Sequence, residues 1–478
     1  MKMIQVLGTS SSAGKTTLAM VLCRHISKLG FRVAPFKSVN MSLNSISLED
    51  GSEISRSVWL QSISAGVPPE KEMNPFLLKP EGRGASQIIV LGKSLGVMSI
   101  ASYRKYMREN AAQIIRDSIK KLEDSFDVIV AEGAGSPAEI NLEGDDFANT
   151  FVSEINGSPC VLITDIDRGG SFASLYGTLE LMRSPELVRW FVINRMSGDP
   201  SVLNTGIRKI ESMTGKKCIG VVPKILEMSV PGEDSLNYEN PSVSSRRIAV
   251  IRYPHMENYS DVDPLTLRGI GFTYVTENNQ DVLDSAELII LPGSKNVPMD
   301  LEYLRMTGIS DRILKFAGSG KYILGICGGY QMLGDSITLR QSEDENTIKG
   351  LSIIRSATFY SERKNVKTSH GFLNPGIFGK DIEVDGYEIH YGEVSDLEGN
   401  PLAFIDGRGE GSVSRNGRVI GTNLHSILEN NSFLSHLLGR DEVHGDYEKI
   451  LDRNIEKITE SFISSMNMEE IIRYIHEN

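Results

Sequence analysis

The first half of the chain alternates short apolar runs with stretches of helical periodicity. Leu18, Val21, Leu22 and Ile26 fall on one face of a helix predicted over residues 15–29. The pattern also predicts a helix at residues 110–122, and strands at residues 4–7, 31–36, 127–131, 161–164 and 190–193. Strands that alternate with helices predict βαβ units and a mainly parallel sheet. Helices cover both faces of such a sheet, which explains why these strands are apolar throughout.

The pattern changes between residues 224 and 247, where a polar stretch contains two prolines and many serines. That composition is typical of a linker. Further strands are predicted at residues 248–251, 288–291 and 322–326, and the end of the chain is charged with a helical pattern. A chain of 478 residues is long enough for two domains. We therefore predict an α/β domain over residues 1–228, a linker at 229–246, a second α/β domain at 247–440 and a helical tail at 441–478.

The charge balance argues against a nucleic-acid-binding protein, because 62 acidic residues outnumber 50 basic ones. A local basic pocket for a small anion remains compatible with this net charge. The four cysteines are far apart in the sequence, so neither a disulfide framework nor a zinc site is predicted. No stretch has the apolar length of a membrane span or the pattern of a signal peptide. We expect a soluble cytoplasmic protein that binds neither nucleic acid nor membrane.

A phosphate-binding loop is predicted between the first strand and the first helix. Glycines and serines let backbone N–H groups surround phosphates, and the helix N-terminus adds its dipole. Lys15 would contact the outer phosphates of a nucleotide, and Thr16 would bind Mg²⁺. The spacing departs from the usual motif by one residue, because Thr9 stands where a glycine is expected. The residues predicted to surround the nucleotide are Gly8, Thr9, Gly14, Lys15, Thr16 and Thr17.

Charged residues follow other strands of the predicted parallel sheet, at the edge where ligands collect. Glu132 ends one strand and is a candidate to hold Mg²⁺ opposite Thr16. Lys37 ends another and is a candidate for the phosphate that is transferred. Arg168 follows a third strand and could bind a carboxylate or phosphate, although charged residues after strands are often simply solvated.

A nucleophile elbow is predicted in the second domain, where Gly325-Ile326-Cys327-Gly328-Gly329 lies between a strand and a helix. The glycines permit the tight turn that lifts the cysteine from the sheet. A helix N-terminus generally favours the thiolate form of a cysteine placed there. Backbone N–H groups at Gly328 and in a second loop around Gly293 would stabilise an oxyanion.

His425 is the predicted base for this cysteine, because it follows a strand downstream of the elbow. His390 is the alternative base. The third member of a triad is not evident. Glu388, in Gly386-Tyr387-Glu388-Ile389-His390, is one candidate.

These motifs resemble two known groups of domains. The lengthened phosphate loop is similar to the dethiobiotin-synthetase-like branch of P-loop proteins, and the elbow, loop and histidine resemble the flavodoxin-like class I glutamine amidotransferases. The amidotransferases carry a glutamate two residues after the histidine, and this chain has Ile427 there. The combination resembles the cobyric acid synthase family. Several segments match that family: residues 35–45, 74–80, 132–142, 165–170, 291–295 and 386–392.

This resemblance implies an ATP- and Mg²⁺-dependent ligase with glutamine and a corrinoid as further substrates. In the family, Cys327 would release ammonia from glutamine. ATP would activate the b, d, e and g carboxylates of adenosylcobyrinic acid a,c-diamide as acyl phosphates, which ammonia converts to the amides of adenosylcobyric acid. Two alternatives share the layout, namely cobyrinic acid a,c-diamide synthase and another amidotransferase such as a cell-wall precursor amidase. A P-loop regulatory ATPase with an inactive glutaminase is an alternative of another class.

Overall fold

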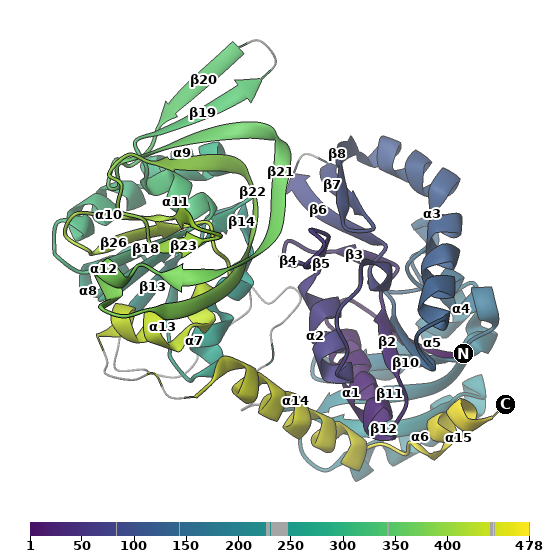
Figure 1. Ribbon diagram of the computed structural model, residues 1–478. Helices are drawn as coiled ribbons and strands as arrows, with labels where there is room; N and C mark the ends of the chain where they lie inside the picture. The colour runs from purple at the N-terminus through teal and green to yellow at the C-terminus, as the bar shows by residue number, and fades with distance from the viewer. Residues whose placement is uncertain are drawn as a thin grey trace. The chain divides into compact units, whose positions relative to one another are not determined.

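The computed structural model describes residues 1–477 except 83, 143, 226–229, 231–246, 342–343, 440–442 and 444. The chain forms two compact units (Figure 1). Unit 1 comprises Met1–Ser42, Glu53–Glu233 and Leu451–Asn478, and unit 2 comprises Leu43–Ser52 and Asp234–Ile450. The predicted linker at 229–246 lies outside the described residues apart from Val230. No helix within the described ranges is long and apolar enough to cross a membrane.

The core of unit 1 is a six-stranded parallel sheet in the order β12-β11-β10-β1-β9-β2. Its strands are β1 (Lys2–Gly8), β2 (Val33–Phe36), β9 (Val128–Glu132), β10 (Cys160–Asp165), β11 (Val188–Met196) and β12 (Lys217–Pro223). Val6 of β1 pairs with Glu132, and Gly8 pairs with Ile163 of β10. The loop that follows Gly8 therefore begins beside Glu132, at the carboxyl edge of the sheet.

The helices of unit 1 are α1 (Lys15–Lys28), α2 (Arg56–Ala65), α3 (Ile100–Glu123), α4 (Thr150–Asn156), α5 (Ser171–Leu181) and α6 (Asn204–Thr214). Helix α1 packs on β1, β2 and β9 through its apolar face, as its periodicity predicted. The predicted helix at residues 110–122 is longer than expected, because α3 begins at Ile100 with Ser99 as its N-cap.

A second sheet in unit 1 was not predicted from the sequence. It has the order β3-β6-β7-β8, with strands β3 (Val39–Met41), β6 (Phe76–Gly82), β7 (Ala85–Val90) and β8 (Lys93–Ser99). Lys79 of β6 is fully buried and pairs with Glu53 of β5 (Glu53–Ser55) at 2.7 Å. A buried charge of this kind interrupts the apolar pattern that identifies a strand in the sequence.

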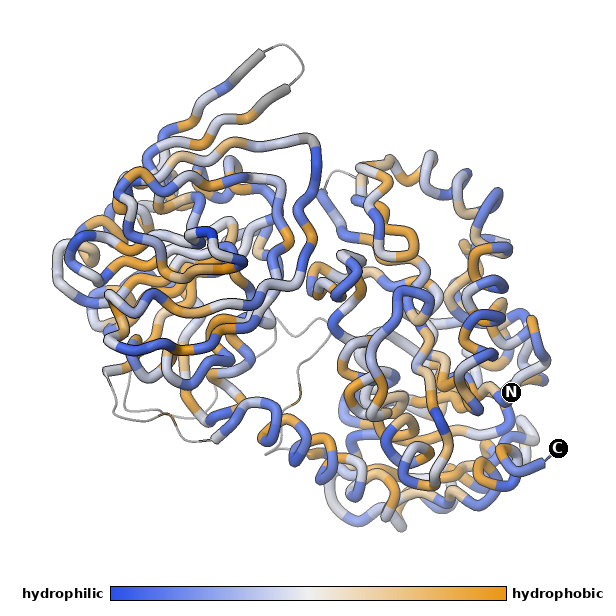
Figure 2. Tube along the Cα trace, in the orientation of Figure 1, coloured by the Kyte–Doolittle hydropathy of each residue, from blue (hydrophilic) through white to orange (hydrophobic). Residues whose placement is uncertain are grey.

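The core of unit 2 is a second α/β sheet, in the order β15-β13-β16-β18-β26-β25. Its strands are β13 (Ile248–Ile251), β15 (Thr273–Val275), β16 (Leu288–Leu291), β18 (Tyr322–Ile326), β25 (Ser412–Val413) and β26 (Val419–Thr422). All pairs are parallel except β25 with β26. Within each unit the hydrophobic residues gather on the strands of the central sheet (Figure 2). The predicted parallel α/β architecture is confirmed in both halves.

The helices of unit 2 are α7 (Asp263–Leu267), α8 (Val282–Ser285), α9 (Val297–Met306), α10 (Ile309–Ala317), α11 (Gly328–Leu333), α12 (Pro375–Phe378) and α13 (Asn431–Leu438). A mainly antiparallel sheet accompanies them, built on a long hairpin of β21 (Ser356–Leu373) and β22 (Ile382–Asp396). Its other strands are β19 (Ser336–Gln341), β20 (Asp344–Lys349), β23 (Ala403–Ile405) and β24 (Arg408–Glu410). A two-stranded pair joins β14 (Met256–Glu257) to β17 (Gly293–Ser294).

The C-terminal tail is helical, and its last part belongs to unit 1. It consists of α14 (Tyr447–Ser464) and α15 (Glu469–His476). The indole N–H of Trp190 donates to Glu470 at 2.7 Å, and the Tyr474 hydroxyl donates to the carbonyl of Met3 at 3.2 Å. The two ends of the chain therefore meet in the same fold.

Candidate active sites

The phosphate loop adopts a conformation that requires glycine at position 14. Gly14 has φ +111°, and a Cβ there would lie 2.2 Å from the side-chain nitrogen of Asn194. The Nζ of Lys15 donates to the carbonyls of Ser10 and Gly135 at 2.9 and 2.8 Å. This lysine therefore lies across the loop and links it to the turn after Glu132.

Thr16, Lys37 and Glu132 meet at one point. The Thr16 hydroxyl donates to Oε1 of Glu132 at 2.7 Å, and Nζ of Lys37 lies 2.9 Å from the same oxygen. Lys37 and Glu132 are almost completely buried. A hydroxyl and a carboxylate oxygen side by side are ligands that fit Mg²⁺, so the donor set agrees with the predicted metal.

Two further residues of this site were missed in the sequence. Nε2 of Gln61 donates to Oε2 of Glu132 at 2.5 Å, and Nδ2 of Asn194 donates to the carbonyl of Ala13 at 3.0 Å. Gln61 lies within α2, where no motif marks it. Asn194 near the end of β11 could have been found as a polar residue at the carboxyl edge of a strand. Arg168, in contrast, is exposed in the loop after β10.

A cavity of about 330 Å³ adjoins the phosphate loop. Its lining includes Thr9, Ser10, Gly135, Glu139 and Ser174. The predicted loop and the Gly-rich turn after Glu132 therefore share one cavity, as expected for a nucleotide site at this edge of a parallel sheet.

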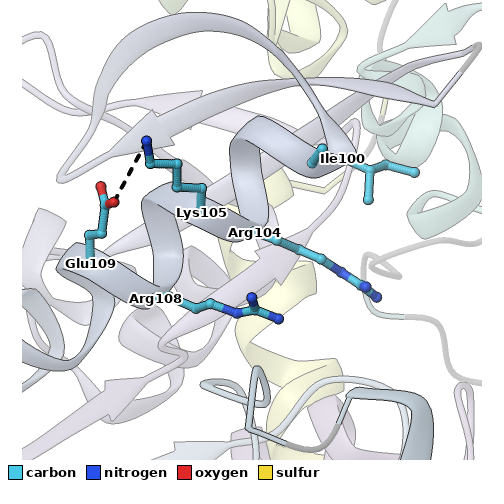
Figure 3. A pocket seen from close by; sticks show the side chains of 6 residues that line it. Ile100, Arg104, Lys105, Arg108 and Glu109 are labelled. Atoms are coloured by element: carbon cyan, nitrogen blue, oxygen red, sulfur yellow. Dashed lines mark ion pairs between the residues drawn. The ribbon is translucent and has the colours of Figure 1, made fainter.

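A wider hollow of about 590 Å³ lies along the first turns of α3 (Figure 3). Its lining includes Ile100, Arg104, Lys105, Arg108 and Glu109. Arg104 and Arg108 extend to one side of the helix, whereas Lys105 points to the other side and pairs with Glu109 at 4.0 Å (Figure 3). Because α3 leads into β9 and runs back along the parallel sheet, its first turns lie toward the edge that carries Glu132.

The elbow in unit 2 holds Cys327 in a strained turn between β18 and α11. Its φ is +51° and its ψ −110°, a conformation that non-glycine residues rarely adopt. The sulfur lies 3.7 Å from the carbonyl oxygen of Ile389 and is buried. Backbone strain at the nucleophilic residue is characteristic of nucleophile elbows.

The second loop of the predicted oxyanion site lies directly against the elbow. A Cβ on Gly328 would lie 2.6 Å from the backbone nitrogen of Ser294, and a Cβ on Gly293 would lie 3.7 Å from Cε1 of His425. The glycines thus allow the two loops and the histidine to approach one another closely.

His425 is fully buried, and its ring contacts Asp261, which lies within the short 3-10 helix η5 (Tyr259–Val262). Nδ1 of His425 lies 2.8 Å from Oδ2 of Asp261, and the ring stacks on Tyr387 with centroids 5.1 Å apart. Burial alone would lower the pKa of His425, but Asp261 and the adjacent sulfur of Cys327 raise it to about 10. Asp261 and Cys327 therefore favour the positively charged form of His425.

Glu388, the candidate third member of the triad in the sequence analysis, contacts His390 and not His425. Its carboxylate accepts from Ser369 at 2.7 Å and pairs with Lys367 at 3.0 Å and His390 at 3.2 Å. Burial would raise the pKa of Glu388, but His390, Ser369 and Lys367 lower it to about 2. Asp261 was missed because it lies in a turn sequence, 164 residues before the histidine.

Glu410 is a further buried carboxylate near this site that the sequence did not reveal. It accepts from the Thr422 hydroxyl and from the backbone N–H of Asn423, each at 2.7 Å. Burial raises its pKa to about 7. These two hydrogen bonds stabilise the turn that leads from β26 to His425.

Two protein families match this chain. Residues 4–234 match the CobQ/CobB/MinD/ParA nucleotide binding domain. Residues 247–433 match the CobB/CobQ-like glutamine amidotransferase domain. The nucleotide-binding and amidotransferase domains that the motifs predicted are therefore confirmed.

Relatives of full length also match. A probable cobyric acid synthase of Thermoplasma acidophilum is 49% identical and covers 99% of both chains. One of Picrophilus torridus is 47% identical over the whole of both chains, and one of Thermococcus gammatolerans is 38% identical over 98% of this chain and 99% of its own. The chain therefore belongs to the cobyric acid synthase family, whose members are glutamine-dependent ligases of cobalamin biosynthesis.

Proposed function

We propose that this protein converts adenosylcobyrinic acid a,c-diamide into adenosylcobyric acid by amidating the b, d, e and g carboxylates. Each amidation would consume one ATP and one glutamine. The observation that carries the proposal is the proximity of Cys327, His425 and Asp261 in a chain that also has a nucleotide-binding domain. ATP and glutamine are cytoplasmic substrates, so we place the reaction in the cytoplasm.

In the glutaminase step, His425 holds the thiol proton of Cys327 and the sulfur attacks the amide carbon of glutamine. The backbone N–H groups of the Gly293 and Gly328 loops stabilise the oxyanion. The C–N bond breaks as His425 returns the proton to the leaving nitrogen, which departs as ammonia. Water then cleaves the thioester and releases glutamate.

In the synthetase step, a carboxylate of the corrinoid attacks the outer phosphorus of ATP, and ADP leaves. Lys15 and Lys37 bind the phosphates and offset their negative charge. Ammonia then attacks the acyl phosphate and displaces inorganic phosphate. Thr16 and Glu132 would hold Mg²⁺, which supplies further positive charge at the phosphates.

The hollow on α3 is the surface that we propose for the corrinoid carboxylates. Arg104 and Arg108 line it, and the exposed apolar residues Leu95, Val97 and Ile100 come from β8 and the start of α3. A large ring with a carboxylate periphery requires both kinds of surface. We expect Arg104→Ala to raise the KM for the corrinoid several-fold without changing the KM for glutamine.

Lys105→Ala is the matched control for that variant, because Lys105 lies on the same turn but points away from Arg104 (Figure 3). An equal rise of KM in both variants would indicate a general effect of charge and would remove this part of the proposal.

Incubation of the protein with the a,c-diamide corrinoid, Mg-ATP and glutamine tests the proposed function. We expect mass spectrometry of the corrinoid to show four successive amidations. An unchanged corrinoid mass would contradict the proposal. Conversion of a corrinoid that lacks the a and c amides would favour the a,c-diamide synthase instead. ATP hydrolysis without glutamate release would favour a regulatory ATPase.

A further inference from the structure

Residues 43–52 belong to unit 2, although in the sequence they lie between strands of unit 1. Three hydrogen bonds join this segment to the turn that carries Asn258. The backbone N–H of Asn258 donates to Leu43 O at 3.4 Å, and that of Ser260 donates to Oδ1 of Asn44 at 3.3 Å. The backbone N–H of Ser45 donates to Oδ1 of Asn258 at 3.2 Å. The side chains of Asn44, Ser45, Asn258 and Ser260 are buried.

Asn258 also contacts the candidate base. Its Nδ2 lies 3.3 Å from Nε2 of His425, the ring nitrogen that is not engaged by Asp261. A backbone N–H can only donate, so the bond from Ser45 fixes the oxygen of the Asn258 amide toward Ser45. The NH₂ group is therefore directed at His425.

This orientation affects the protonation state of the base. The lone pair on Nε2 must accept the thiol proton of Cys327, and an N–H from Asn258 occupies that same lone pair. The contact disfavours a proton on Nε2 and so works against Asp261 and the sulfur of Cys327, which raise the pKa of His425 and favour the imidazolium–thiolate pair. A rotated amide would instead present its oxygen to the Nε2–H of imidazolium and would stabilise the reactive pair.

The segment is linked through the backbone to the phosphate site. Leu43 follows Lys37 by six residues, with β3 (Val39–Met41) between them. Lys37 lies 2.9 Å from the oxygen of Glu132 that also accepts from Thr16. A cation held by Thr16 and Glu132, together with nucleotide phosphates, would compete with Lys37 for this carboxylate and draw the lysine toward the phosphates.

We propose that residues 43–45 act as a latch that keeps Asn258 donating to His425 until the synthetase site is filled. Release of the Ser45 bond lets the Asn258 amide rotate and switches the glutaminase on, so glutamine is not hydrolysed without an acceptor for ammonia. The proposal rests on the proposed function for the identity of the two sites.

The test is glutamate release by the full chain, measured with and without Mg-ATP and corrinoid. We expect the wild type to be stimulated at least about tenfold, within the usual range of coupling between sites. Asn258→Gly should raise the unstimulated rate to near the stimulated rate. Glycine suits this position because Asn258 has φ +50°. Wild-type rates that do not respond to the substrates, or an equal loss of both rates in the variant, would overturn the proposal.

Asn44→Ala is a second variant, which removes the acceptor for Ser260 and should raise the unstimulated rate in the same direction. It decides the outcome if Asn258→Gly does not fold. Amidation of the corrinoid with ammonium salt reports on unit 1 alone, so failure of that reaction would count against the proposed function and not against the latch.

Alkylation of Cys327 by iodoacetamide gives a readout that does not depend on turnover. Burial raises the pKa of Cys23, Cys160 and Cys218, so these thiols should react slowly. We expect the pH profile of Cys327 alkylation to move to lower pH in Asn258→Gly, because the thiolate is formed more readily. An unchanged profile would show that Asn258 does not influence the base and would overturn the latch.

Discussion

Asp261 contacts His425 in a chain that has Ile427 where related amidotransferases carry a glutamate two residues after the histidine. It binds Nδ1 of His425, and that nitrogen must carry a proton so that Nε2 can act as the base. A carboxylate held against a buried histidine also stabilises the imidazolium that forms during the reaction. We therefore propose Asp261 as the third member of the catalytic triad, and it precedes Cys327 in the sequence.

We expect Asp261→Asn to lower the rate of glutamate release roughly 10²–10⁴-fold, because the base loses its orientation and its countercharge. Amidation with ammonium salt should be unaffected. Glu388→Gln is the matched control, since this carboxylate is buried nearby but pairs with other residues. A larger loss in Glu388→Gln than in Asp261→Asn would reverse the assignment.

Cys327→Ala should abolish glutamine-dependent amidation completely, because no thioester can form. The same variant should amidate the corrinoid at the wild-type rate when ammonium salt replaces glutamine. Corrinoid mass spectrometry with each nitrogen source separates the two results. Persistent glutamine-dependent activity would show that another residue is the nucleophile.

The sequence predicted the nucleophile and the base candidates, but not their neighbours. Cys327 is marked by glycines on both sides and by a strand before it, and these local signals survive in a single sequence. Asp261 and Asn258 lie in a turn, Asn-Tyr-Ser-Asp, with no strand pattern close to them. Their proximity to His425 depends on the packing of distant segments, which no local pattern encodes.

At the scale of elements, a buried carboxylate on β24 helps to hold the turn after β26. Glu410 accepts two hydrogen bonds from this turn, yet burial raises its pKa from 4.5 to about 7. The folded protein therefore retains a proton at Glu410 that the unfolded chain releases above pH 4.5. The contribution of Glu410 to the free energy of unfolding consequently falls as the pH rises from about 4.5 to about 7.

We expect Glu410→Gln to remove this loss, because glutamine cannot ionise. The free energy of unfolding of the variant minus that of the wild type should rise by about 2–3 kcal/mol from pH 5 to pH 8, at about 1.4 kcal/mol per pKa unit. Denaturant unfolding of both proteins at the two pH values gives the comparison. A stability difference between the proteins that is independent of pH would contradict the assignment of this titration to Glu410.

Elements with strong periodicity were predicted well, and those with buried charges were not. The apolar runs of β1, β9 and β18 identify them because both faces of a parallel strand are covered. Strand β6 contains Lys79, whose buried charge is balanced by Glu53. Strand β8 is largely exposed and contains Ser94, Gly96 and Ser99, so it resembles a loop in the sequence.

At the scale of the whole molecule, the C-terminal helices complete the N-terminal fold. Leu451, Ile455, Ile458 and Phe462 of α14 and Ile471 and Ile475 of α15 are buried. Burial of such a side chain contributes roughly 1.5–3 kcal/mol. The tail should therefore be an integral part of unit 1.

We expect a protein that ends at Ile450 to lose amidation with ammonium salt and to show a lower Tm for unit 1. Alkylation of Cys327 should persist, because unit 2 retains all of its own residues up to Ile450. Wild-type amidation by the shortened protein would show that the tail contributes little to the ATP site.

The exchange of segments between the two halves of the sequence limits how the gene can be divided. A break within residues 229–246 would give a first product without residues 451–478 and a second product without residues 43–52. Each product would lack a part that only the other carries. Recombination that swaps one half for that of a distant relative would meet the same obstacle, so the two halves should be inherited together as a matched pair.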